Sequence, residues 1–221
     1  MLIAGKEIDW DEIGRADNRQ HAHHEAGHAV ADFLFDNSYR ISHICMESSE
    51  EIMGEVWRSR PKEITDLILR LKYTQSEMAN EGERRAAYRE ILTLFAGPAA
   101  GDRVVDEPNG DWLSSLNEEI DESANDLPMA RELAGIVWRT WGRQESIIRT
   151  VAKWADELMA IPRVWGTVTA LAGKLGHGVT MSGEDACRIM REAWGDDDGL
   201  AIRSLGRKWT RRFMVQKTKG R

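Results

Sequence analysis

One stretch of ten residues, HAHHEAGHAV at 21–30, constrains this chain more than any other. It holds four of the six histidines and belongs to a longer segment whose small and apolar residues recur at helical spacing. That spacing predicts a helix over 16–35, with Asp17 or Asn18 as its N-cap. The fold must therefore be built around a helix that carries both an apolar stripe and a row of imidazoles.

Within this predicted helix, His24, Glu25 and His28 form the pattern HExxH. Residues four apart share a helix face, so His24 and His28 can offer two imidazole nitrogens to one cation. Zinc accepts such ligands and lowers the pKa of a bound water to about 7. Glu25 is expected to lie beside the metal as the general base that takes the proton of that water. His21 and His23 are expected to face solvent.

A catalytic zinc site usually has a third protein ligand. The extended pattern HExxHxxGxxH is ruled out, because Ala31 and Leu34 occupy its glycine and final histidine positions. Asp32 lies one turn further along the same helix and cannot reach an ion shared by the two preceding turns, so it is expected to support the ligands instead. Glu122 and Asp126 are four residues apart in a later acidic segment, and spacing alone leaves the choice between them open.

The rest of the chain predicts a mainly α fold with one small β-hairpin. The segments RISHICMES and MGEVWRS are rich in β-branched or aromatic residues and predict the hairpin over 41–58. Ser182 and Asp185 have the spacing of an N-terminal helix cap. Helical periodicity predicts further helices over 61–73, 82–105, 125–141, 145–160, 163–175 and 182–194. The tryptophans on these helices are expected in the core, among them Trp138, Trp141 and Trp154.

Length and composition bound the class of protein. The 221 residues are 42% hydrophobic and 30% charged, as in ordinary globular domains, and predict a single domain over 1–221 with its core over about 16–196. Cys45 and Cys187 form no CxxC pair, which favours a reducing compartment with both thiols in the core. Neither a signal peptide nor a membrane-spanning apolar run is recognisable, so a cytoplasmic protein is expected.

The charge is unevenly distributed along the chain. The net charge is −7, but the tail over 201–221 carries eight Lys or Arg and no acidic residue, which leaves −15 for the other residues. A basic tail can bind nucleic acid or an acidic partner, or it can be a solvated terminus. The solvated terminus is favoured, so nucleic-acid binding is not the expected function.

Two of these motifs together resemble the peptidase domain of the FtsH-type AAA zinc metalloproteases. HHEAGHAV at 23–30 resembles the helix that provides two histidine ligands and the base in that family. SANDLPMARELA at 123–134 resembles the segment whose aspartate, Asp126 here, provides the third ligand. Weaker similarity extends to the hairpin, to AGPAAGDRV at 96–104 and to LAGKLGHGVTMSGEDACRIM at 171–190, so the resemblance covers most of residues 20–192.

This resemblance implies a zincin-like HExxH helix followed by a C-terminal helical bundle. It implies a zinc-dependent endopeptidase in which His24, His28 and Asp126 bind Zn2+, Glu25 is the base, and the edge of the hairpin holds an extended protein or peptide substrate. The family's proteases also carry a transmembrane segment and an ATPase module, but this chain has no GxxxxGK[ST] loop. ATP-independent cleavage of unfolded or flexible proteins is therefore implied, and a hexamer is not. The alternative is a catalytically inactive binding or adaptor module with structural zinc.

Overall fold

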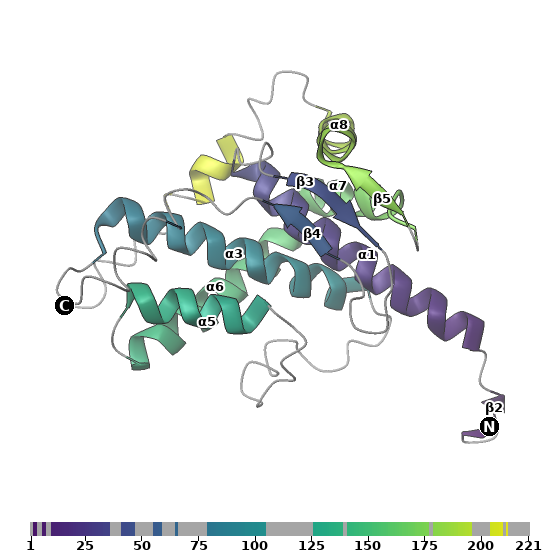
Figure 1. Cartoon of the computed structure of the whole chain (residues 1–221), viewed down its shortest axis with the longest axis horizontal. Coiled ribbons are helices and arrows are strands. Elements are labelled where there is room, and N and C mark those ends of the chain that lie inside the picture. Colours follow the sequence, from purple (N-terminus) through teal and green to yellow (C-terminus); the bar gives the residue numbers. More distant parts are fainter. Residues whose placement is uncertain are drawn as a thin grey trace.

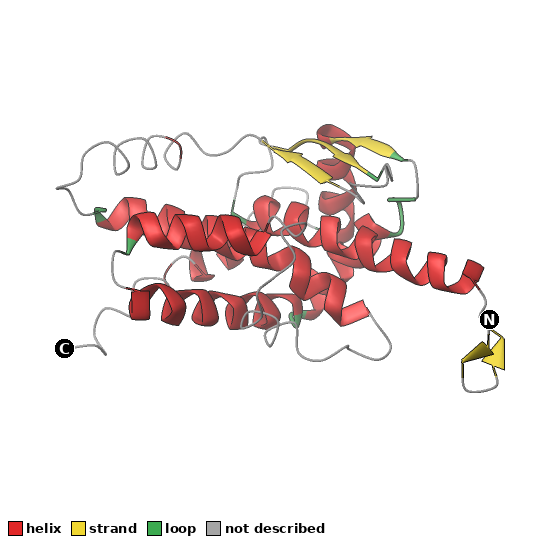
Figure 2. Ribbon diagram, turned by 60° about the horizontal axis from the view of Figure 1, so that its bottom comes forward, coloured by secondary structure: helices red, strands yellow, loops and turns green. Residues whose placement is uncertain are grey.

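The computed structural model describes residues 2–3, 6–7, 10–35, 41–46, 55–58, 65, 79–104, 126–138, 141–176, 179–195, 204–209 and 211. As predicted, these residues are mainly helical, with a small antiparallel sheet on one side of the helices (Figures 1 and 2). Two short strands, β1 (Leu2–Ile3) and β2 (Lys6–Glu7), pair with each other at the N-terminus, away from the helices. Apart from Thr65, the predicted helix over 61–73 lies outside the described residues.

The centre of the molecule is the contact between two long helices, α1 (Trp10–Leu34) and α3 (Glu81–Val104). Gly27 of α1 allows a close approach, because a Cβ there would overlap the carbonyl oxygen of Ala96 and lie 2.8 Å from the Cβ of Ala100. The largest fully buried side chains gather around this contact and the helices next to it, and they include Leu34, Ile91, Leu92, Phe95, Ile148 and Leu158.

The beginning of α1 differs from the prediction. The helix begins at Trp10, so Asp17 and Asn18 lie inside it and do not cap it. The residues between Trp10 and the histidines are mostly polar and lack an apolar stripe, so hydrophobic periodicity could not reveal this part of the helix. The predicted helix over 82–105 is confirmed as α3, and Pro98 lies inside it.

The predicted hairpin is confirmed, and it belongs to a larger sheet. β3 (Ile41–Cys45) pairs antiparallel with β4 (Glu55–Arg58). A third strand that the sequence does not predict, β5 (Thr180–Ser182), pairs with the other side of β3. β3 is therefore the central strand, and the outer edges of the described sheet belong to β4 and β5.

The remaining described helices pack around α1 and α3. They are α5 (Asp126–Val137), α6 (Trp141–Met159), α7 (Pro162–Ala172) and α8 (Gly183–Trp194). The prediction of one helix over 125–141 is wrong at its end, because α5 stops at Val137 and Gln144 of α6 donates a hydrogen bond to the carbonyl of Trp138 at 2.5 Å. The predicted cap of α8 is confirmed, since the Ser182 hydroxyl accepts a hydrogen bond from the Asp185 N–H at 3.1 Å.

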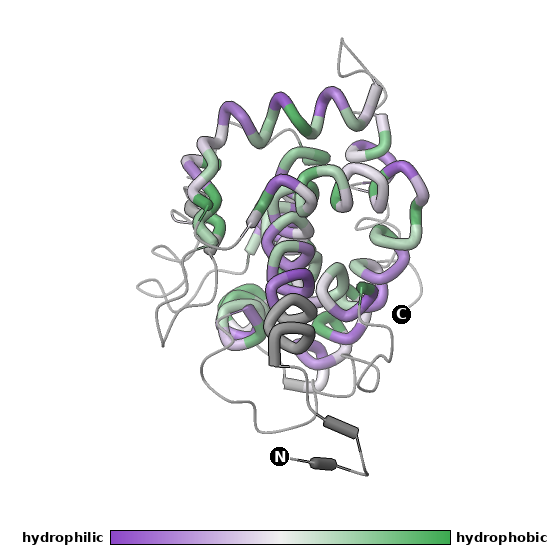
Figure 3. Tube along the Cα trace, turned by 90° about the vertical axis from the view of Figure 1, so that its right-hand side faces the viewer, coloured by the Kyte–Doolittle hydropathy of each residue, from purple (hydrophilic) through white to green (hydrophobic). Residues whose placement is uncertain are grey.

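Aromatic side chains fill the space between α3, α5 and α6. Trp138 and Trp154 are buried as predicted, and their rings lie 4.9 and 6.0 Å from the ring of Tyr88. The side chain of Trp141 lies outside the described part of the structure. Hydrophilic residues recur along the long helices (Figure 3), and none of the described helices is both long and apolar enough to cross a membrane.

The two thiols differ in burial. Cys187 of α8 is buried, as predicted, whereas Cys45 at the end of β3 is only partly buried. The prediction that both thiols are core residues is therefore right for Cys187 alone.

Candidate metal centre

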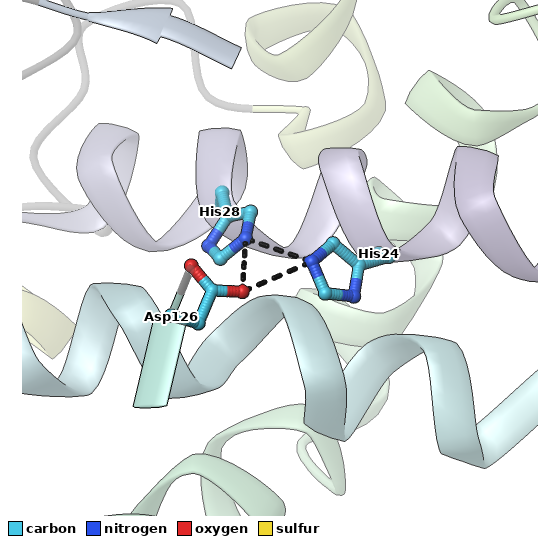
Figure 4. Close-up of side chains that lie close together, drawn as sticks. All are labelled: His24, His28 and Asp126. Carbon is cyan, nitrogen blue, oxygen red and sulfur yellow. Dashed lines mark hydrogen bonds and ion pairs between the residues drawn. The ribbon is translucent and has the colours of Figure 1, made fainter. Parts of the chain in front are cut away.

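Three side chains from two helices converge between α1 and α5 (Figure 4). His24 and His28 lie one turn apart on α1, and Asp126 is the first residue of α5. The Nε2 atoms of the two imidazoles are 3.1 Å apart, and each lies 3.1 Å from Oδ2 of Asp126. The three atoms thus form a nearly equilateral triangle of potential ligands.

The dimensions of this triangle suit a small divalent cation. Tetrahedral zinc with bonds of about 2.0–2.1 Å holds its ligand atoms about 3.3–3.4 Å apart, so the observed separations need to open only slightly. Two imidazole nitrogens and one carboxylate oxygen are a donor set that zinc accepts, with one position left for a fourth ligand. The described residues thus contain a group that could bind a metal ion.

The orientation of His28 is determined by α3. Its Nδ1 donates a hydrogen bond to the backbone carbonyl of Thr93 at 2.8 Å, inside the core. A carbonyl oxygen can only accept, so Nδ1 carries a proton and the lone pair of the neutral ring lies on Nε2. This partner also holds the plane of the ring, as backbone carbonyls commonly do for histidine ligands of metals.

The charges in the triangle stabilise one another. Burial by itself would lower the pKa of His28, but the Asp126 carboxylate, together with smaller contributions from Glu25 and the Thr93 carbonyl, raises the pKa to about 9. Burial likewise opposes ionisation of Asp126, yet the two imidazoles hold the pKa of its carboxyl well below its ordinary value. The site therefore strongly favours positive charge next to Asp126, and a cation would supply it.

The three side chains of the centre differ in their exposure to solvent. The side chain of His24 is 30% exposed and that of Asp126 is 19% exposed, whereas that of His28 is 9% exposed. Glu25 follows His24 on α1, is itself buried, and lies near enough to His28 to influence its pKa. The arrangement thus combines a partly open cluster of metal-binding groups with an adjacent carboxylate.

Two expectations for the HAHHEAGHAV helix need correction. His23 does not face solvent: it is buried, its ring lies 5.5 Å from that of Trp165, and its Nδ1 is 2.8 Å from the carbonyl oxygen of Arg19. Helix α7, which carries Trp165, covers the side of α1 on which His23 lies. The periodicity of α1 alone cannot predict this contact. His21 is partly buried.

The acidic candidates are placed differently. Asp126 joins the two histidines, whereas Glu122 lies outside the described residues. Asp32 is completely buried and is not a member of the group of potential ligands found among the described residues. Sequence reasoning missed Thr93, since any residue type supplies a backbone carbonyl and only the packing of α3 on α1 brings this one to His28.

No protein-family model and no curated protein matches the sequence.

Proposed function

We propose that this protein is a zinc-dependent endopeptidase in which His24, His28 and Asp126 bind zinc and Glu25 is the general base. The observation that carries the proposal is that three potential ligand atoms lie mutually 3.1 Å apart, and the helix that provides two of them also carries Glu25. A structural zinc site usually has four protein ligands, whereas three ligands with an open position are typical of catalytic sites. The resemblance to FtsH-type peptidase domains supports the same ligand set.

Each residue has a defined task in this proposal. Zinc, when bound, would acidify a water molecule and polarise the carbonyl of the scissile peptide bond. Thr93 keeps the lone pair of His28 on Nε2, and Asp126 balances the positive charge. Glu25 accepts the proton from the attacking water on its carboxylate and passes it to the nitrogen of the leaving amine.

The substrate proposal follows from the sheet. One side of β3 is paired with β4 and the other with β5, so β3 has no edge to offer. The outer edge of β4 is the part of the hairpin at which an extended peptide could add as a further strand. Loosely folded proteins and peptides are the substrates of choice, because they supply an extended backbone without prior unfolding.

The test compares Glu25→Gln with the parent chain after reloading with one equivalent of zinc. Cleavage of casein and of a quenched fluorescent peptide should fall by about 10²–10⁴-fold, the usual contribution of a general base. Zinc content should stay unchanged, because glutamine leaves all three ligands in place. His21→Ala is the matched control, since this histidine lies on the same helix outside the cluster.

Three results would decide against parts of this proposal. Zinc-dependent cleavage that survives in Glu25→Gln would remove Glu25 from its role. A chain that binds zinc but cleaves no unfolded protein would favour the binding or adaptor module. Zinc binding that persists in Asp126→Ala would exclude Asp126 as the third ligand.

A further inference from the structure

We propose that Gly97 of α3 is a positioning residue for the metal centre: its missing side chain leaves the space in which the imidazole of His28 points Nε2 at the other two ligands. This inference deepens the proposed function and rests on it where zinc is concerned. The packing that carries it is a property of the chain itself.

The space beside Gly97 is occupied by the ligand ring. A Cβ added to Gly97 would lie within 2.8 Å of three atoms of the His28 imidazole, and the nearest of them would be Nε2. Real Cβ atoms essentially never approach other atoms this closely, so the ring or the helix would have to move. The group that must give way is the nitrogen that is to bind the metal.

The ring has little freedom to move. Its Nδ1 is tied to the carbonyl of Thr93, and His28 is buried between α1 and α3. Thr93 and Gly97 are one turn apart on α3, so a single face of this helix holds one ring nitrogen and leaves room for the other. Displacing the ring by the width of a methyl group would cost either the hydrogen bond to Thr93 or the alignment of Nε2 with Asp126.

Two other glycines of the same interface provide contrasts. A Cβ on Gly27 would overlap backbone and side-chain atoms of Ala96 and Ala100, so Gly27 serves helix packing and not the ligands. A Cβ on Gly101 would have its nearest neighbours at 3.5 Å, among them the Cβ of His24, which is an ordinary van der Waals contact. Gly97 differs from both because the nearest atom in the space it leaves is Nε2 of His28, a potential metal ligand.

The first experiment measures zinc affinity by competition with a chromophoric chelator. Gly97→Ala should bind zinc about 10–100-fold more weakly than the parent chain, the range typical when support of a metal ligand is lost. Gly101→Ala should bind zinc as the parent does. Circular dichroism in the same samples confirms that both variants are folded.

The second experiment needs no metal and is made in the presence of a chelator. The denaturation midpoint is measured for Gly97→Ala alone and in the His28→Ala background. Alone, the substitution should lower the midpoint, because the methyl group meets the ring. With His28 shortened, it should lower the midpoint much less, because only the strain between a helical alanine and the following Pro98 then remains. Gly101→Ala should have the same effect in both backgrounds, and Gly27→Ala should lower the midpoint in both.

The outcomes separate the two proposals. A parent chain that binds no zinc refutes the zinc peptidase. A parent chain that binds zinc, together with unchanged affinity in Gly97→Ala, refutes only the positioning role. If Gly97→Ala unfolds the chain but Gly97→Ala with His28→Ala folds, the steric conflict with the ring is supported. If both are unfolded, or both are equally destabilised, the conflict lies elsewhere and the inference is overturned.

Discussion

At the scale of single residues, the two nitrogens of His28 have separate tasks. Nδ1 donates to the Thr93 carbonyl, and Nε2 faces Asp126 and His24. Burial of the ring opposes its positive charge, but the carboxylate of Asp126, together with Glu25 and the Thr93 carbonyl, raises the pKa of His28 to about 9. Without a metal ion, protonated His28 and the carboxylate of Asp126 therefore form an ion pair.

This ion pair predicts a pH dependence of stability in the chelator-treated protein. The raised pKa of His28 contributes stability fully below 6.5, and this contribution is lost as the pH rises through about 9. The lowered pKa of Asp126 contributes stability above 3.8 that is lost as the pH falls. The free energy of unfolding of the parent should therefore exceed that of Asp126→Asn most between pH 3.8 and 6.5.

The shift in the pKa of His28 corresponds to a stability contribution on the order of 3 kcal/mol, which sets the scale of this difference. Denaturant unfolding of the two proteins across the pH range measures it. An advantage of the parent chain that persists undiminished above pH 9 would show that His28 is not the titrating partner.

At the scale of elements, α3 is the platform on which the centre is built. It carries Thr93 and packs against α1, with close contacts at Gly27 and Gly97. Its beginning is held by a reciprocal cap, in which Oδ1 of Asn80 accepts from the Glu83 N–H at 3.0 Å and a Glu83 carboxylate oxygen accepts from the Asn80 N–H at 2.6 Å. Two backbone donors that the helix itself leaves unpaired are thereby satisfied.

Loss of this cap should weaken the fold without touching the metal centre. Asn80→Ala is expected to lower the free energy of unfolding by about 1 kcal/mol, because one backbone N–H loses its acceptor. Asn80→Asp, which keeps an acceptor at the same position, should be nearly neutral. Denaturant unfolding measures both variants, and zinc affinity should be unchanged. Equal losses in the two variants would mean that the cap is not the source of the stability.

At the scale of the whole molecule, the centre connects helices that are far apart in the chain. α1 provides two of its groups, and α5 provides the third at its first residue. A metal ion that binds only the folded chain must stabilise it, because the unfolded chain does not bring these groups together.

Zinc should therefore raise the thermal unfolding midpoint. At a free zinc concentration 100-fold above the dissociation constant, the gain is about 2.7 kcal/mol, or roughly 5–10 °C for a chain of this size. Differential scanning fluorimetry with and without chelator measures the shift. His21→Ala should respond as the parent does, and Asp126→Ala should lose the response. An equal response in Asp126→Ala would place the bound zinc elsewhere.

Several features of this protein could be predicted because local sequence determines them. The helix around His24 and His28, the hairpin over 41–58 and the cap at Ser182 depend on periodicity and on contacts between near neighbours. The position of His24 and His28 on one helix face is such a feature, since four residues make about one turn. Asp126, in contrast, was suggested by resemblance and not by spacing.

The remaining features depend on which helix packs against which. The burial of His23 under Trp165, the pairing of β5 with β3 and the use of the Thr93 carbonyl all join segments distant in the chain. These features are hard to predict from sequence. Every residue has a backbone carbonyl, and a strand of three residues is too short to show an alternation of apolar and polar side chains. Local sequence is enough to specify a helix that carries two imidazoles and a carboxylate. The directions in which those imidazoles point, and the acid that they meet, depend on the packing of α3 on α1 and of α5 on α3, which no local pattern specifies.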